Sequence, residues 1–333
     1  MNKYPKGLVL GKFMPLHLGH EYLLRFARQY CEELTVVVDC LEQQTISVGT
    51  RVKWISELGL GENVKIVGLE RSTPQSPEET PLFWDIWKQT LYQAMGGKPD
   101  VLVAAMDYGW PLSHALECAF VQCDIERESI PVSATLIREN PMAHWEFIAA
   151  PARPYFLRKV AFMGPESAGK STCASNLAKA LGTVYVPEYA KAVIVAQHGN
   201  FYEKNVEEVA FGQHRSERAL ACMSNRLQVC DTNVLTTLVW SEYLFGGHPP
   251  SLEALVEASG YDRIFLFDPS LPWVPDVHRN VLSSSCSSSE RMRFFDLCQH
   301  WLTHFGLNYD VVSGSHESRF DYCLAQSKAL ISA

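Results

Sequence analysis

Residues 164–171 of this chain are Gly-Pro-Glu-Ser-Ala-Gly-Lys-Ser, which satisfies the pattern G-x-x-x-x-G-K-[ST]. The stretch follows a strand expected at residues 159–163 and opens a helix expected at residues 171–181. Its glycines allow successive backbone N–H groups to face a phosphate, and the helix N-terminus adds a partial positive charge. The sequence therefore predicts a nucleotide-binding loop in an α/β fold.

The side chains of this loop predict how it would hold ATP. Lys170 would reach the β- and γ-phosphates, and Ser171 would ligate Mg²⁺. The phosphates would lie against the other positions of the loop, which are Gly164, Glu166, Ser167, Ala168 and Gly169.

Two acidic residues follow expected strands in the same half of the chain. Asp231 comes directly after residues 227–230, the position of a carboxylate that holds Mg²⁺ through water; a helix cap or a turn is the alternative. Glu188 follows residues 183–186, where small-molecule kinases often keep the carboxylate that activates the acceptor hydroxyl. Its alternative is a solvated loop position. The kinase base therefore stays open between Glu188 and Asp231.

A serine-rich stretch at residues 283–289 is predicted to form a loop, because its composition cannot build a core. Three arginines flank it: Arg279, Arg291 and Arg293. A closing lid that carries an arginine would neutralise charge on a transferring phosphoryl group, and plain surface arginines are the alternative. The recognition elements of GTPases, motors and transport ATPases are not found, so a compact small-molecule kinase is favoured.

The first half of the chain carries a second phosphate motif, GKFMPLHLGH, at residues 11–20. His17 and His20 are three residues apart, so both imidazoles share a face of a first helical turn, and Gly19 leaves room for a phosphate. Together with Lys12 they form a site for the phosphates of ATP, where they would stabilise charge as pyrophosphate leaves. Satisfied core or surface histidines are the alternative.

A partner motif occurs late in the same half, at residues 132–138. Ser133 and Thr135 can cap a helix and donate to phosphate, while Arg138 offers a bidentate fork; a simple cap with a surface arginine is the alternative. No cysteine or serine has a paired base nearby in the sequence. We therefore infer direct attack of a substrate phosphate on the α-phosphorus of ATP.

Apolar runs alternate with amphipathic stretches along both halves, which predicts parallel sheets covered on both faces. In the first half, strands are expected at residues 7–10, 34–38, 64–67 and 101–104, and helices at 21–30, 51–58, 82–94 and 142–148. In the second half, a further strand is expected at residues 263–267. Two prolines within residues 151–154 mark a boundary. The prediction is two tandem α/β domains, a nucleotidyltransferase at residues 1–150 and a P-loop kinase at residues 155–333.

Composition narrows the class of protein. The 333 residues include 29 Lys+Arg against 37 Asp+Glu, and the net charge of −8 argues against a strongly basic nucleic-acid surface. No apolar run approaches the ~18 residues that span a bilayer, and the start lacks the cleavage site of a signal peptide. The ten cysteines are scattered, with no C-x-x-C. We expect a cytoplasmic protein without a nucleic-acid or membrane partner.

A His-x-Gly-His motif followed by a P-loop resembles the bifunctional nicotinamide-nucleotide adenylyltransferase/ribosylnicotinamide kinase family over nearly the whole chain. Further matching segments are Arg51-x-x-Trp54, Asp107-Tyr108-Gly109, Arg153-Pro154-Tyr155-Phe156, Val186-Pro187-Glu188-Tyr189-Ala190, Asp231-Thr232-Asn233-x-x-Thr236-Thr237, Pro272-Trp273-Val274 and Ser313-Gly314. The resemblance implies a Rossmann-like transferase fold and two linked reactions. Nicotinamide riboside plus ATP gives nicotinamide mononucleotide (NMN), and NMN plus ATP gives NAD and pyrophosphate.

The resemblance also implies roles for residues at matching positions. Roles in adenylyl transfer fall to Gly11, Lys12, Phe13, His17, His20, Asp107, Ser133, Thr135 and Arg138. Binding of ATP and Mg²⁺ in the kinase falls to residues 164–171 with Thr172, Asp231 and Arg279. Substrate contacts fall to Trp54, Tyr189, Thr236 and Trp273. Trp273 would offer a stacking face to nicotinamide, and a core or loop tryptophan is its alternative.

Three features depart from the family. Ala104-Ala105-Met106 stands where the family has a Ser-Ser-Glu-like stretch, which removes hydroxyls and a carboxylate from a substrate or metal contact. Asp276-Val277-His278-Arg279 lacks the glycine that usually precedes the lid arginine. The family's transcriptional regulators carry a helix-turn-helix before the transferase, whereas this chain begins at the first strand, so no DNA-binding role is expected.

Two other functions stay open. Bifunctional coenzyme A synthases also join a His-x-Gly-His transferase to a P-loop kinase, but residues 188–190, residues 231–237 and Trp273 favour nicotinamide. A non-catalytic sensor of adenine or nicotinamide nucleotides is the second alternative, motivated by the substitution at residues 104–106. Complete phosphate motifs in both halves favour an enzyme. The sequence leaves open whether the chain forms a homo-oligomer.

Overall fold

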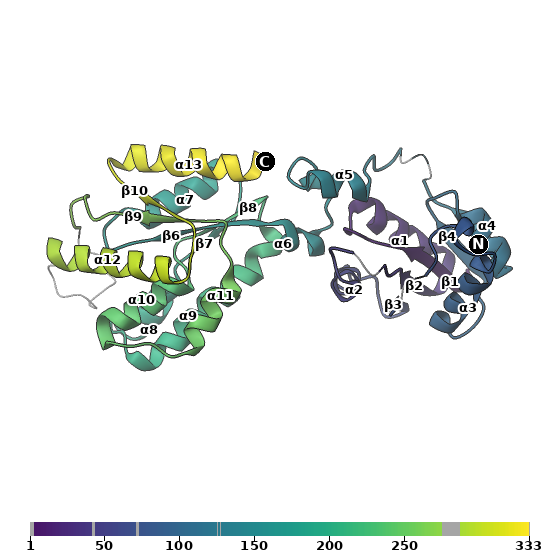
Figure 1. The fold of residues 1–333 in the computed structure, drawn as a ribbon, viewed down its shortest axis with the longest axis horizontal. Coiled ribbons are helices and arrows are strands. Elements are labelled where there is room, and N and C mark those ends of the chain that lie inside the picture. The colour runs from purple at the N-terminus through teal and green to yellow at the C-terminus, as the bar shows by residue number, and fades with distance from the viewer. Residues whose placement is uncertain are drawn as a thin grey trace. The chain divides into compact units, whose positions relative to one another are not determined.

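The computed structural model describes residues 3–41, 44–70, 73–124, 126, 128–274 and 287–332. The chain divides into two compact units, which we call unit 1 (Met1–Arg153) and unit 2 (Pro154–Ala333) (Figure 1).

Unit 1 is built on a five-stranded parallel sheet with the order β3-β2-β1-β4-β5. Its strands are β1 (Tyr4–Gly11), β2 (Cys31–Val38), β3 (Val64–Gly68), β4 (Val101–Ala104) and β5 (Ala119–Gln122). Its helices are α1 (Leu18–Tyr30), α2 (Val48–Ser56), α3 (Phe83–Met95), α4 (Gly109–Leu116) and α5 (Ala134–Glu139), with 3-10 turns at Pro77–Glu79, Trp145–Phe147 and Ala150–Ala152. Helices α3 and α4 cover one face, where Leu91 and Leu112 pack with Leu8 and Leu102.

Unit 2 also contains a five-stranded parallel sheet, with the order β10-β9-β6-β8-β7. Its strands are β6 (Arg158–Met163), β7 (Tyr185–Val186), β8 (Leu227–Cys230), β9 (Arg263–Phe267) and β10 (Tyr309–Val312). The helices are α7 (Lys170–Ala180), α8 (Tyr189–Ala196), α9 (Val206–Leu220), α10 (Val234–Phe245), α11 (Ser251–Ser259), α12 (Ser288–His304) and α13 (His316–Ser332). Helix α6 (Arg153–Phe156) and 3-10 turns at Glu203–Asn205 and Ala221–Met223 complete the unit.

The sheet of unit 2 is covered on both faces, as its apolar strands require. On one face, Leu177 of α7 and Cys323 of α13 pack with Phe162 and Phe265. On the other face, helices α9 to α12 pack against residues such as Ala161. Figure 1 shows α7 and α13 on one side of the sheet and helices α8 to α11 on the other.

Polar side chains begin several helices, because they accept hydrogen bonds from backbone N–H groups that lack a helical partner. The capping side chains are His17 for α1, Ser47 for α2, Ser133 for α5, Asn233 for α10 and Ser287 for α12. Ser287 forms a full capping box with Glu290. The cap that the sequence predicts at Ser133 is thus present.

The α/β class and the two parallel sheets are confirmed, and every expected strand is present. The prediction of a helix at residues 142–148 was wrong. Only Trp145–Phe147 is helical there, as a single 3-10 turn, and Ile148 is extended and forms a β-bridge with His17. Strands β5 and β10 were not predicted. The serine-rich stretch is only partly described: Ser288 and Ser289 belong to α12, whereas residues 275–286, including Arg279, lie outside the described residues.

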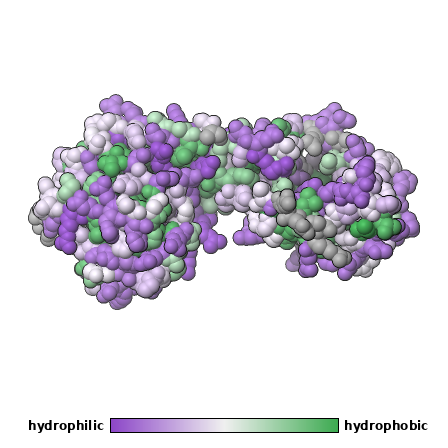
Figure 2. Space-filling view, viewed as in Figure 1, coloured by the Kyte–Doolittle hydropathy of each residue, from purple (hydrophilic) through white to green (hydrophobic). Residues whose placement is uncertain are grey.

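Hydrophilic residues cover most of the displayed face of each unit, with small hydrophobic patches between them (Figure 2). No helix within the described ranges is both long enough and apolar enough to cross a bilayer. The nine cysteines that these ranges contain are free thiols.

Candidate active sites

A cavity of about 920 Å³ lies in unit 1 at the carboxyl ends of four strands. Gly11 ends β1, Asp39 follows β2, Ala105 follows β4 and Cys123 follows β5, and all four residues line the cavity. The first strand of the unit lies between β2 and β4, so the cavity is at the point where the strand order reverses. Parallel α/β sheets bind ligands in this position.

One end of the cavity is formed by the His-x-Gly-His motif. The imidazoles of His17 and His20 stack with ring centroids 3.7 Å apart, and Nδ1 of His17 accepts from the backbone N–H of His20 at 3.3 Å. Both residues line the cavity together with Lys12. Gly19 also lines the cavity, and a Cβ there would lie 3.0 Å from Cε1 of His17, so the glycine makes room for an imidazole as well.

Helix α5 brings the partner motif to the same end. Ser133 Oγ accepts from the backbone N–H of Leu136 at 3.2 Å and so begins the helix. Arg138 donates to the carbonyl of Met14 at 2.5 Å and to Thr135 Oγ1 at 3.1 Å. Ser133, Thr135 and Arg138 all line the cavity, so the structure brings together the phosphate residues predicted in the first half.

The other end of the cavity is aromatic and was not predicted from the sequence. Phe83, Trp84 and Trp87 come from the start of α3, where neighbouring aromatic residues are usually core. Asp39 lies beside them, buried, and accepts from Thr73 Oγ1 at 2.9 Å and from the amide of Gln75 at 3.1 Å. The arrangement suits a flat ring that carries a polar substituent.

Two predicted residues of unit 1 do not reach this cavity. Trp54 is buried in α2, and Asp107 is exposed after β4; neither lines the cavity. Arg51, one turn before Trp54, is fully buried and donates to the carbonyls of Lys12 at 2.6 Å and Asp39 at 3.0 Å. Burial lowers its pKa. Arg51 therefore fixes the backbone at two corners of the cavity.

The P-loop of unit 2 lies between β6 and α7, as predicted. Gly164 has φ +130°, and a Cβ there would lie 2.4 Å from the carbonyl oxygen of Phe267, so only glycine fits. Lys170 Nζ donates to the carbonyl of Pro165 at 2.7 Å and thus folds over the loop. Ser167 Oγ donates to the carbonyl of Val274 at 2.7 Å.

Arg319 of α13 holds the P-loop through hydrogen bonds, a role that was not predicted from the sequence. Its side chain is fully buried and donates to the carbonyls of Ala168 and Asp268, both at 3.3 Å, and to the carboxylate of Asp268. It also donates to the carbonyl of Gly314 at 2.9 Å. One guanidinium thus joins the P-loop, the end of β9 and the loop that precedes α13.

Asp231 lies beside the P-loop and is 1% exposed. Its Oδ2 accepts from the Tyr185 hydroxyl at 2.6 Å. Burial raises the pKa of Asp231, although the hydroxyls of Tyr185 and Ser171 and the Lys191 ammonium favour the charged form. Oδ1 is buried and has no hydrogen-bond partner among the described residues. A buried carboxylate oxygen beside the Ser171 hydroxyl fits Mg²⁺, which prefers hard oxygen ligands.

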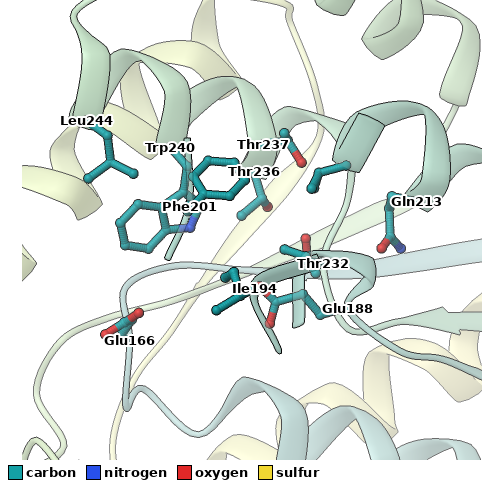
Figure 3. A pocket seen from close by; sticks show the side chains of 12 residues that line it. Glu166, Glu188, Ile194, Phe201, Gln213, Thr232, Thr236, Thr237, Trp240 and Leu244 are labelled. Carbon is teal, nitrogen blue, oxygen red and sulfur yellow. The ribbon is translucent and has the colours of Figure 1, made fainter. Parts of the chain in front are cut away.

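A pocket lies next to the P-loop and is drawn in Figure 3. Glu166 and Glu188 line it together with Thr236, as the resemblance predicts for the last of these. Its aromatic wall is formed by Phe201 and Trp240. Figure 3 shows these two rings side by side, with Glu188 and Thr232 on the other side of the pocket.

Several predicted residues of unit 2 lie away from this pocket. Trp273 is half-buried and does not line the pocket. Tyr189 is also half-buried and does not line the pocket, because its ring packs over Gly212. Thr172 is exposed on α7. Arg291 was expected either in a closing lid or as a plain surface arginine; it is instead buried and donates to the carbonyl of Leu271 at 2.8 Å.

Comparison with known proteins agrees with this geometry. A family model described as an AAA domain matches residues 159–319. The trifunctional NAD biosynthesis/regulator protein NadR of Escherichia coli (strain K12) is 28% identical over 340 aligned positions, which cover 96% of this chain and 81% of that protein. The chain is homologous to NadR. The NadR protein of Salmonella typhimurium (strain LT2) is 27% identical, and the alignment covers 98% of this chain and 83% of that protein.

Solved NadR structures have the same fold. A crystal structure of NadR in complex with NR superimposes with a TM-score of 0.79 at 20% identity and covers 99% of this chain and 97% of that one. A second NadR structure, in complex with NAD and AMP-PNP, gives a TM-score of 0.78 at 21% identity with the same coverage.

Proposed function

We propose that this chain is a bifunctional enzyme of NAD synthesis. Unit 2 would phosphorylate nicotinamide riboside with ATP to give NMN, and unit 1 would join NMN to the adenylyl group of ATP to give NAD and pyrophosphate. The observation that carries the proposal is that each unit has its own phosphate-binding residues next to its own aromatic-lined pocket. Homology to NadR, a protein of NAD biosynthesis by name, supports it.

In unit 2, the riboside would lie with its pyridine ring against Phe201 and Trp240. Its 5′-hydroxyl attacks the γ-phosphorus of ATP, the bond from that phosphorus to the β,γ-bridging oxygen breaks, and ADP leaves. We assign the hydroxyl proton to Glu188, because Glu188 lines the pocket whereas Asp231 does not. Lys170 would turn from the Pro165 carbonyl to the phosphates.

Ser171 and Asp231 would hold Mg²⁺, which supplies positive charge to the β- and γ-phosphates when bound. The buried Oδ1 of Asp231, which lacks a hydrogen bond within the described ranges, supports this assignment. Tyr185 orients the carboxylate through its other oxygen.

In unit 1, the pyridine ring of NMN would lie among Phe83, Trp84 and Trp87, with its amide toward Asp39 and Gln75. A phosphate oxygen of NMN attacks the α-phosphorus of ATP, the bond to the α,β-bridging oxygen breaks, and pyrophosphate leaves. The phosphate end of the cavity would stabilise the charge that develops, through Lys12, His17, His20 and Arg138.

The experiment that tests this proposal is a product assay. The protein is incubated with nicotinamide riboside, ATP and Mg²⁺, and NMN and NAD are separated by chromatography. Accumulation of both supports the proposal, and NMN alone would show that the transferase half is either impaired or prefers another mononucleotide. If neither forms while phosphopantetheine is converted to coenzyme A, the coenzyme A alternative replaces it.

The non-catalytic sensor is tested in the same assay by the release of pyrophosphate. Release by the native protein that disappears in His20→Ala removes the sensor, whereas binding of nucleotides without release of pyrophosphate or ADP supports it.

We place the enzyme in the cytoplasm, where ATP is available and free thiols persist. A homo-oligomer is a further proposal that sedimentation can decide.

A further inference from the structure

The ammonium group of Lys191 lies among the groups that would hold a cation in unit 2. Its Nζ is 3.2 Å from Ser171 Oγ, 3.9 Å from Asp231 Oδ2 and 3.8 Å from Glu188 Oε2. Lys191 is on the first turn of α8, directly after the strand and loop that carry Glu188. No motif in the sequence singled it out.

The position is unusual because Ser171 and Asp231 are the two residues that we assign to Mg²⁺. Asp231 is almost completely buried, and a buried carboxylate is costly unless a positive charge or hydrogen bonds compensate it. Tyr185 supplies one hydrogen bond, and Lys191 supplies the positive charge. A site built for a divalent cation thus holds a monovalent one from the chain itself.

The side chain of Lys191 is free enough to leave this position. It is 40% exposed, in contrast to the 1% of Asp231, and it sits on a flexible four-carbon stem. Exposure on one side gives the ammonium group a path to water that does not require the P-loop or Asp231 to move.

We propose that Lys191 occupies the cation position of the kinase site in the nucleotide-free protein and withdraws when Mg²⁺ enters with ATP. This inference rests on the proposed function only for the identity of the site. Its consequence is competition: Mg²⁺ must displace an internal ammonium group, and the free protein keeps Asp231 compensated until it does. Lys191 is a positioning residue here, because it acts through Asp231 and Ser171.

The test uses Mn²⁺ as a paramagnetic probe with AMP-PNP, on the full chain. Asp231→Asn reports Mn²⁺ bound elsewhere, including in unit 1, and this amount is subtracted. Lys191→Met removes the ammonium group, and Lys179→Met, an exposed lysine on α7, is the matched control. Free Mn²⁺ is measured by electron paramagnetic resonance, so the readout does not depend on turnover or on nicotinamide riboside.

We expect Lys191→Met to bind Mn²⁺ at the Asp231-dependent site about 5- to 20-fold more tightly, which is the lower part of the roughly 5- to 150-fold range of ordinary coupling between two sites. The nucleotide-free variant should also melt at a lower temperature, and Mn²⁺ with AMP-PNP should remove most of that difference. Unchanged Mn²⁺ affinity would overturn the proposal, and weaker binding would do so too, because it would show that Lys191 holds the phosphates.

The two proposals can fail separately. If the native protein binds Mn²⁺ and AMP-PNP at the Asp231-dependent site but does not phosphorylate nicotinamide riboside, the proposed substrate is wrong. The displacement proposal is then still tested by comparing the Mn²⁺ affinities of the native protein and Lys191→Met. If riboside is phosphorylated but Lys191→Met leaves Mn²⁺ binding unchanged, only the displacement proposal is wrong.

Discussion

Both units place their predicted phosphate-binding residues at the carboxyl end of the first strand in their sheets, but the residues differ in kind. In unit 1 the groups are side chains, with the imidazoles of His17 and His20 stacked over the start of α1. In unit 2 the loop from Gly164 to Gly169 offers its backbone, and Lys170 is the main charged side chain. We therefore propose that one sheet architecture supports two ways of stabilising phosphate charge.

The glycines of the two motifs show the same difference. Gly19 makes room for the ring of His17, whereas Gly164 makes room for the backbone of Phe267 at a positive φ. A side-chain neighbour can shift, but a backbone neighbour in a central strand cannot shift without disturbing the sheet. We therefore expect the first site to tolerate small changes in its loop better than the second.

The largest effect that would separate the two units is expected from Lys170→Ala. Loss of the ammonium group that stabilises the transferring phosphate should slow phosphorylation of the riboside at least ~10²-fold. Adenylyl transfer to added NMN should stay within a factor of two, since its groups lie in unit 1. Rates of both reactions, measured separately, check this, with Lys179→Ala as the control. A folded variant that loses both reactions would contradict the assignment of one reaction to each unit.

The glycine comparison predicts a second, smaller effect. Gly164→Ala forces a Cβ against a backbone oxygen at positive φ and should destabilise unit 2 by about 3 kcal/mol. Gly19→Ala should cost less than about 1 kcal/mol, because only an imidazole has to move, while the rate of adenylyl transfer falls. Hydrogen exchange resolved by unit measures both. Equal losses of stability would contradict the distinction.

A buried arginine under each phosphate loop gives the third prediction. Arg51 binds the carbonyl of Lys12 in unit 1, and Arg319 binds that of Ala168 in unit 2. Replacing either by Met leaves buried carbonyls without a partner, so each variant should lose about 2 kcal/mol of stability in its own unit only. Hydrogen exchange again locates the loss. Protection that falls in both units for either variant would disprove the assignment.

The smallest expected effect is a pH dependence confined to unit 2. Burial by itself lowers the pKa of His248, but hydrogen bonds to Glu253 and Glu242 outweigh it and leave the pKa raised. Because the folded pKa exceeds the unfolded one, the stabilisation is complete below the ordinary pKa of about 6.5 and is lost as pH rises through the folded pKa.

His248→Gln should therefore be less stable than the native protein at pH 6, by less than about 1 kcal/mol, and the difference should shrink by pH 8. Thermal unfolding at several pH values measures it. A difference that grows with pH would show that the sign is wrong.

Much of this architecture was predictable because the central strands of each sheet, such as β4, β6 and β9, are largely buried and therefore appear as continuous apolar runs. Strand β10 was not predicted because Tyr309 and Asp310 are only partly buried and Val311 is exposed, so the strand does not appear as an apolar run. The phosphate residues were predictable because loop chemistry restricts which residues fit at fixed spacing. These constraints act between neighbours in the sequence.

Residues that act across long sequence separations were not predictable in the same way. Arg319 reaches the P-loop from 151 positions away, and nothing near it in the sequence marks it as a support. Trp240 lines the pocket of unit 2, whereas Trp273, which the motif resemblance favoured, does not. Only the packing of α10 against the rest of the unit distinguishes these tryptophans.

The most direct test of the claim that each unit carries one reaction combines two variants. Nicotinamide riboside, ATP and Mg²⁺ are supplied to His17→Ala, to Lys170→Ala and to an equimolar mixture, and NMN and NAD are followed by chromatography. We predict that His17→Ala stops at NMN, that Lys170→Ala makes neither product, and that the mixture makes NAD. A mixture of folded variants that makes no NAD would contradict it.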